Sequence, residues 1–389
     1  MGDRNDRWPF LDLVRFGAAL LVMFGHVRGF FFQSISQVEN AGAATKAFYL
    51  LTGVHREAVV LFFVVSGFLI GGRAWQLIEQ GRFDFARYVL DRFTRIYLVL
   101  LPALILIAAI SWFGSSFFQD TRLFGVRPLE PAGITSGWTW SQVPCHLASL
   151  QGVACVPWGL DPPLWSLGYE WVFYFLAPLG LCAFYARFHP VARAAAFIVT
   201  LCAVASVISL VTGLRSFASL FAIWFLGAAA ARMVAWKSVP TALGAAGLVL
   251  AAGCMVVSRT KSVPLETIDA GIAIGLALAL ACRPILGFRV PGPLVHRGAA
   301  FSFSLYLLHI PVGLLAGAVL ETFGFPRELA PPGAVSFAAF VVTAATCLAA
   351  SYGFARLTED NTGAVRRWLR SPQTKRAAAD EPIAASARV

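Results

Sequence analysis

The sequence predicts an all-α integral membrane protein, built as a bundle of about ten transmembrane helices. Of its 389 residues, 58% are hydrophobic and only 13% are charged, and the mean hydropathy is +0.72. A soluble protein carries roughly twice that share of charged residues. The hydrophobic residues also gather in runs of about twenty, which is the length at which an α-helix crosses the hydrocarbon core of a bilayer.

The apolar runs and the basic residues between them predict the topology. Ten runs are long enough to span a membrane, at residues 9–31, 58–78, 94–113, 164–186, 194–213, 216–235, 240–257, 267–283, 299–320 and 334–355. With the N-terminus in the cytoplasm, 21 of the 31 Lys and Arg residues lie on the cytoplasmic side and nine on the outer side, and Arg15 lies within the first run. The positive-inside rule then places both termini in the cytoplasm. We expect one transmembrane domain over residues 1–370 and a disordered tail over residues 371–389.

The net charge of +11 fits this topology, because cytoplasmic loops are basic and attract anionic lipid. The lipid bilayer is therefore the first expected partner. Nucleic acid is a poor alternative, since the basic residues are scattered between apolar runs and form no continuous patch. No Cys or His spacing suggests zinc or haem, so we expect no metal.

Two of the seven cysteines, Cys145 and Cys155, lie in the long polar connection at residues 114–163. The other five lie in apolar runs or end one. Cys145 and Cys155 are ten residues apart on the predicted outer side, where disulfides persist. We predict a bridge that pins part of this loop over the outer opening, with two free thiols as the alternative.

Two ionisable residues, Arg15 and His26, lie inside the first apolar run. On a helix, their spacing of eleven residues places them on one face, about 16 Å apart along the axis. A charged residue inside a membrane costs roughly 2.5–3.5 kcal/mol on insertion scales, so such residues indicate function by default. The pair suggests a site for a long ligand that is anionic at one end and reactive at the other. Taken singly, Arg15 also fits an interfacial anchor and His26 a hydrogen-bonded core residue.

The second and third runs add polar groups. Ser66 and Gly67 are typical of close helix packing in membranes, although Ser66 could instead bind a ligand or the His26 face. Arg92 and Arg95 are three residues apart and share a helical face. Two guanidinium groups there could bind phosphates in a bidentate manner, or could serve as interfacial anchors.

The fourth and ninth runs carry Glu170 and His309. A carboxylate as deep as Glu170 indicates a functional site. Counting from the outer ends of their runs, Glu170 lies roughly 10 Å and His26 roughly 7 Å below the outer surface, so we expect them to meet. His309 lies near mid-membrane among further polar side chains, including Tyr306, and it also fits a hydrogen-bonded core histidine.

Six motifs, in order and on the right runs, resemble acyltransferase family 3, the bacterial membrane proteins that O-acylate polysaccharides, lipopolysaccharides and related molecules. The motifs are LDLVRFGAALLVMFGH (11–26), LFFVVSGFLI (61–70), RFTRIY (92–97), LWSLGYEWVFYFLAP (164–178), FSLYLLHIPV (303–312) and SYGFARLTED (351–360). The resemblance covers residues 11 to about 360. It implies a location in the bacterial cytoplasmic (inner) membrane.

The resemblance also implies site residues and a donor. Arg15, Arg92 and Arg95 would hold the phosphates of cytoplasmic acyl-CoA, with acetyl as the commonest acyl group. His26 would act as general base, and Glu170 would orient its imidazole. Supporting roles are expected for Ser66, Trp165, Ser166, Tyr306 and His309. Acyl-CoA enters as donor substrate, and no permanently bound cofactor is expected.

The acceptor implied by the resemblance is a hydroxyl group of an extracytoplasmic glycan or glycolipid, such as an exopolysaccharide or O-antigen. A separate polysaccharide-assembly or acceptor-presenting protein is an expected partner. Three alternatives remain open. They are an acyl-histidine intermediate, Ser66 as nucleophile, and a multipass transporter of an anionic solute or glycan precursor. Against the transporter, the sequence shows neither paired broken helices nor repeat symmetry.

Overall fold

The computed structural model describes residues 8–125, 140–158, 160–185, 188–211, 213–288, 293–325 and 328–370, and this part of the chain contains helices and no β-strands. The all-α fold class is therefore confirmed. The predicted tail at residues 371–389 lies outside the described residues, as does part of the long loop.

Within the described ranges, nine helical segments are long and apolar enough to cross a membrane. They are Pro9–Phe31 (α1), His55–Glu79 (α3, His55–Ser66; η2, Gly67–Gly71; α4, Gly72–Glu79), Phe85–Phe117 (α5), Leu164–Phe184 (α7), Pro190–Leu210 (α8), Leu214–Trp236 (α9), Thr241–Thr260 (α10, Thr241–Val257, with η4, Ser258–Thr260), Ser302–Thr322 (α14) and Ala334–Arg370 (α15, Ala334–Leu357, with η5, Glu359–Asn361, and a helical end). Shorter helices are α2 (Ala43–Thr52), α6 (Val143–Leu147), α12 (Arg283–Leu286) and α13 (Pro293–Ala300).

The run predicted at residues 267–283 forms α11 (Leu265–Leu280), which at 16 residues is too short to count among the nine segments. α11 nevertheless returns along α10, and the glycine backbones of Gly247 and Gly275 meet between them. It begins near Arg28 at the C-terminal end of α1, and the chain then reaches α13, where Gly298 packs against Phe16. The chain therefore crosses from one end of α1 towards the other along α11.

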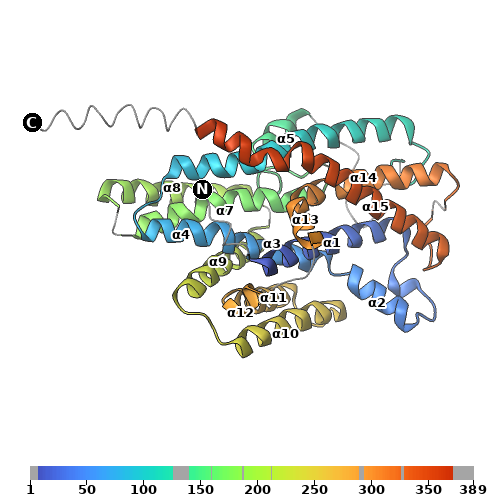
Figure 1. Ribbon diagram of the computed structural model, residues 1–389. Helices are drawn as coiled ribbons and strands as arrows, with labels where there is room; N and C mark the ends of the chain where they lie inside the picture. The colour runs from blue at the N-terminus through green and yellow to red at the C-terminus, as the bar shows by residue number, and fades with distance from the viewer. Residues whose placement is uncertain are drawn as a thin grey trace, which may run out of the picture.

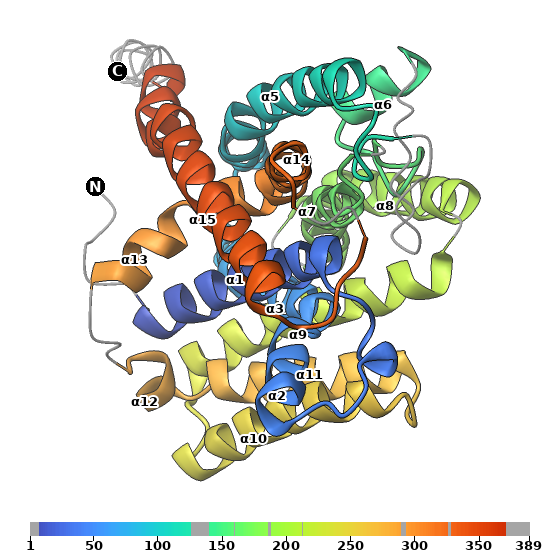
Figure 2. The same cartoon turned by 90° about the vertical axis from the view of Figure 1, so that its right-hand side faces the viewer.

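The long helices extend across the bundle in Figure 1, and Figure 2 shows that they cross one another at different angles. α14 lies inside the bundle and is seen almost end-on between α5, α7 and α15 in Figure 2. In the most apolar 18-residue stretch of α14, 72% of the residues are buried, against 6% in that of the peripheral α8. The polar residues in the first half of α14 are buried among the other helices, namely Ser302, Ser304, Tyr306 and His309.

Small residues allow α3 and α9 to pack backbone against backbone. A side chain on Gly67 would overlap the carbonyl of Trp224, and one on Gly227 would overlap the carbonyl of Val64. The packing interpretation of the Ser66–Gly67 pair is thus confirmed. The helix passes into the π turn η2 at Gly67, and such turns are frequent at functional sites.

The predicted disulfide is present in the long loop, where it joins Cys145 and Cys155 with their Cα atoms 6.4 Å apart. The bridged segment and the chain after it enter the bundle, because Gln151, Trp158 and Asp161 are all buried. α7 therefore starts well inside the protein, and this placement decides where Glu170 lies.

Candidate functional site

A pocket of about 380 Å³ lies between α1, α3, α5, α7 and α14, and four guanidinium groups line it. Arg15 comes from α1, and Arg92 and Arg95 come from α5. The fourth, Arg366, comes from the helical end after α15. The three arginines named from the sequence are thus brought together. Arg366 was missed because nothing local distinguishes it from the other basic residues near the C-terminus.

The arginines differ in how they are held. Arg95 forms an ion pair with Glu359 at 2.6 Å, and the second oxygen of Glu359 accepts hydrogen bonds from the backbone N–H (3.2 Å) and hydroxyl (2.9 Å) of Ser304. Arg15 donates to Ser302 at 3.4 Å. Arg92 has no carboxylate partner within the described residues, and its buried Nε makes no hydrogen bond there. Arg92 therefore has the most free donors for an anionic ligand.

Glu170 lies in the same pocket, where Tyr174 donates a 2.6 Å hydrogen bond to its carboxylate. The Tyr174 hydroxyl is 3.4 Å from that of Ser66, which also accepts a 3.1 Å hydrogen bond from the indole N–H of Trp224. Ser66 thus both adjoins the tight packing at Gly67 and lines the pocket. The carboxylate of Glu170 also hydrogen-bonds to the Ser66 hydroxyl, so the serine lies beside an acidic side chain and not beside an imidazole.

Ser166 and Tyr306 also line the pocket. The Tyr306 hydroxyl donates to the carbonyl of Pro163 at 2.9 Å and lies 2.6 Å from that of Ser166. Trp165, also named from the sequence, is absent from the pocket lining and packs near Phe63 and Tyr169 instead. The supporting residues from α7 and α14 therefore meet, except for Trp165.

One helical turn beyond Tyr306, His309 lies against His26. Nδ1 of His26 is 3.0 Å from Nε2 of His309. Nδ1 of His309 in turn contacts the carbonyl oxygens of Leu305 (3.1 Å) and Tyr306 (2.8 Å). Carbonyls only accept, so Nδ1 of His309 carries the proton and its Nε2 is the acceptor when the ring is neutral. His26 must then donate from Nδ1, which leaves the lone pair of its Nε2 free.

A third histidine, His55, adjoins this pair. Its ring centroid is 5.0 Å from that of His26, as is the centroid of His309. His55 begins α3 and lies just outside the run predicted at residues 58–78, so nothing in the sequence singled it out. Only the packing of α3 against α1 reveals that the two rings meet.

The expected contact between Glu170 and His26 is wrong. α1 packs against α3 and α14, whereas α7 packs against α4, α8 and α9. The predicted depth of Glu170 was wrong because α7 starts inside the bundle, where Asp161 and Leu164 are buried, and not at its surface. It starts beside Tyr306, which is one turn from His309, and Glu170 follows about 10 Å further along α7, towards the arginines. The neighbours of His26 are His309 and His55.

Comparison with known proteins gives one result. The family model described as an acyltransferase domain matches residues 8–352 of the chain. No curated protein and no solved structure matches the chain.

Proposed function

The chain belongs to acyltransferase family 3, and we propose that it transfers an acyl group, acetyl by default, from cytoplasmic acyl-CoA to a hydroxyl of an extracytoplasmic glycan or glycolipid. The observation that carries this proposal is the arrangement along α1. The arginine pocket surrounds Arg15, and the histidine pair includes His26, about 16 Å further along the same helix. A donor with phosphates at one end and a thioester at the other fits this spacing.

For the donor, the pocket offers guanidinium forks that match phosphate oxygens. Its volume of about 380 Å³ is near the lower end for ligand sites. It therefore suits the narrow pantetheine arm, while the nucleotide remains at the mouth near Arg92 and Arg366. Glu170 lies among these arginines, so its proposed role is to position them rather than to orient His26.

For the chemistry, His26 is the proposed general base. Its Nε2 takes the proton of the acceptor hydroxyl as the hydroxyl oxygen attacks the thioester carbonyl. The carbon–sulfur bond then breaks, and the imidazolium returns the proton to the departing CoA thiolate. Nε2 of His309 accepts the hydrogen bond from Nδ1–H of His26 and so fixes the productive tautomer. This orienting role was expected of Glu170 from the sequence. An acyl-histidine intermediate is compatible with the same residues.

Sidedness follows from the basic residues. We propose ten passes, α11 included, with both termini in the cytoplasm of the bacterial cell and the arginine pocket on that side. A reporter fused after Arg370 should be active only in a form that works in the cytoplasm. Activity of a periplasmic reporter at that junction would overturn the topology.

Purified protein in liposomes containing radiolabelled acetyl-CoA tests the proposed activity. Release of CoA in the presence of an acceptor, with label appearing on that acceptor, is the expected result. Movement of intact acetyl-CoA or of a saccharide across the bilayer without turnover would favour the transporter instead. Mass spectrometry of surface glycans from a strain lacking the gene would identify the acceptor.

A further inference from the structure

A second cavity, of about 920 Å³, lies at the opposite end of α1 from Arg15. Arg28 from α1 lines it, together with residues of α2, the start of α3 and the connection from α10 to α11. On the proposed topology it opens on the outer side. No step of the proposed acyl transfer uses this cavity.

The lining of this cavity is strongly basic. Five cationic side chains line it: Arg28, Lys46, Arg56, Arg259 and Lys261. Glu57 is the only carboxylate among the lining residues that the structure describes. Nine basic residues were assigned to the outer side, and five of them converge on this cavity. Because outer segments are poor in Lys and Arg, this concentration calls for an anionic partner.

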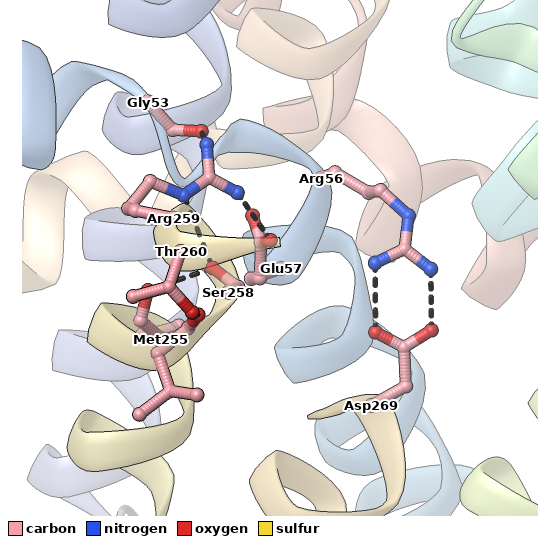
Figure 3. A network of polar contacts seen from close by, with 9 residues as sticks. Gly53, Arg56, Glu57, Met255, Ser258, Arg259, Thr260 and Asp269 are labelled. Carbon is pink, nitrogen blue, oxygen red and sulfur yellow. Dashed lines mark hydrogen bonds and ion pairs between the residues drawn. The ribbon is translucent and has the colours of Figure 1, made fainter. Parts of the chain in front are cut away.

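Two of the five cations are already neutralised within the protein (Figure 3). Arg56 forms two parallel hydrogen bonds, of 3.0 and 2.6 Å, with Asp269 of α11. Arg259 binds the buried carboxylate of Glu57 and the carbonyl of Gly53. These contacts tie α3 to α10 and α11, and they fix the wall of the cavity.

The other three cations remain available. Arg28, Lys46 and Lys261 have no carboxylate partner in the part of the chain that the structure describes. The guanidinium of Arg28 lies 4.9 Å from the Tyr49 ring centroid, and its buried Nε makes no hydrogen bond to any described residue. A half-buried cation with an unused donor is costly unless a ligand satisfies it.

The cavity also lies next to the histidines. His55 lies within electrostatic range of Arg28, Arg56 and Arg259, which all line the cavity. The rings of His26 and His55 are 5.0 Å apart. A molecule held in this cavity would therefore approach the proposed base from the side opposite the donor pocket.

We propose that this cavity binds the acidic group of the acceptor, a carboxylate or phosphate carried by a saccharide, through Arg28, Lys46 and Lys261. This inference rests on the proposed function and names the class of its second substrate as an anionic saccharide. Neutral sugars would lack the charge that the three free cations match. The volume is large enough for more than one sugar ring.

Binding to the purified full-length protein in nanodiscs of zwitterionic lipid tests this directly and requires no acyl transfer. The probe is tri-galacturonic acid, and its trimethyl ester is the uncharged control of the same shape. We expect the acid to bind, the ester to bind at least tenfold more weakly, and the affinity of the acid to fall with rising ionic strength. Arg28→Gln should weaken binding of the acid about tenfold, because a charge-assisted hydrogen bond is lost.

Lys46→Gln and Lys261→Gln should weaken binding less, since both side chains are exposed. Arg215→Gln, which removes an exposed charge on the same proposed side but outside the cavity, is the matched control and should change nothing. Arg28→Lys, which keeps the charge, should restore part of the affinity and guards against misfolding.

Equal binding of acid and ester, or no loss in Arg28→Gln, would overturn the proposal. A lipid effect would overturn it as well. In that case phosphatidylglycerol in the nanodisc would raise thermal stability and displace the acid, and Arg28→Gln would abolish the stabilisation. The cavity would then be a lipid headgroup site. Acid binding by a protein without acetyl-CoA turnover would contradict the proposed function alone. Turnover with no acid binding would contradict only this inference.

Discussion

The hydrogen bond between His26 and His309 gives a prediction that tests the proposed base. His309→Leu removes the acceptor of this bond, whereas His309→Gln places a carbonyl oxygen near the position of the lost Nε2. We expect His309→Leu to lower acyl transfer strongly and His309→Gln to retain more of it. His26→Ala should have the largest effect of the series.

The expected magnitudes follow from the contacts. The bond, 3.0 Å long, joins two groups that are neutral when His26 acts as a base, and such a bond contributes about 0.5–1.5 kcal/mol. Its loss alone lowers turnover about two- to tenfold. The freed His26 ring also adopts the tautomer with the proton on Nε2, and in that tautomer Nε2 cannot accept the proton of the hydroxyl. We therefore expect turnover to fall by about 10- to 100-fold in total. His26→Ala removes the base itself and should cost about 10²–10⁴-fold.

The assay is acetyl transfer by proteoliposomes at matched protein content, with acetyl-CoA binding and thermal unfolding as controls for folding. Because His309 acts through His26, the double variant should be no slower than His26→Ala alone. Near-normal transfer by His309→Leu would refute the positioning role. An equal further loss in the His26→Ala background would refute it as well, because His309 would then act independently.

Three further predictions concern the donor, the loop and its buried acid. Arg92→Ala should raise the KM for acyl-CoA about tenfold with little change in kcat. Arg95→Ala should weaken donor binding and also lower thermal stability, because it leaves the buried carboxylate of Glu359 unpaired. Unchanged acyl-CoA binding in both variants would mean that Arg92 and Arg95 are interfacial anchors. Replacing Cys145 and Cys155 with serine should lower the free energy of unfolding by about 3 kcal/mol, and labelling of both wild-type thiols in intact cells would contradict the bridge. Burial raises the pKa of Asp161 well above its usual range, so the folded state holds the proton more tightly and stability falls as pH rises from about 4 through the folded pKa. Asp161→Asn should raise the thermal midpoint at neutral pH and flatten this decline, and a variant that declines like the wild type would exclude Asp161 as the cause.

The sequence by itself determined the helices and the residues that share a helix face. Apolar runs of membrane length became helices, because an isolated backbone in lipid has no other way to satisfy its hydrogen bonds. Arg15 and His26 do share a face, since both contact α14, through Ser302 and His309. The fixed rise and rotation per residue of an α-helix make such a relation readable from spacing alone.

Only the tertiary structure decided which faces meet. It paired His26 with His309 rather than Glu170, because the loop enters the bundle and starts α7 beside Tyr306. It also gathered four further cations, from segments far apart in the sequence, around Arg28. Such contacts depend on how side chains of different helices fill the space between them, and no local spacing encodes that packing.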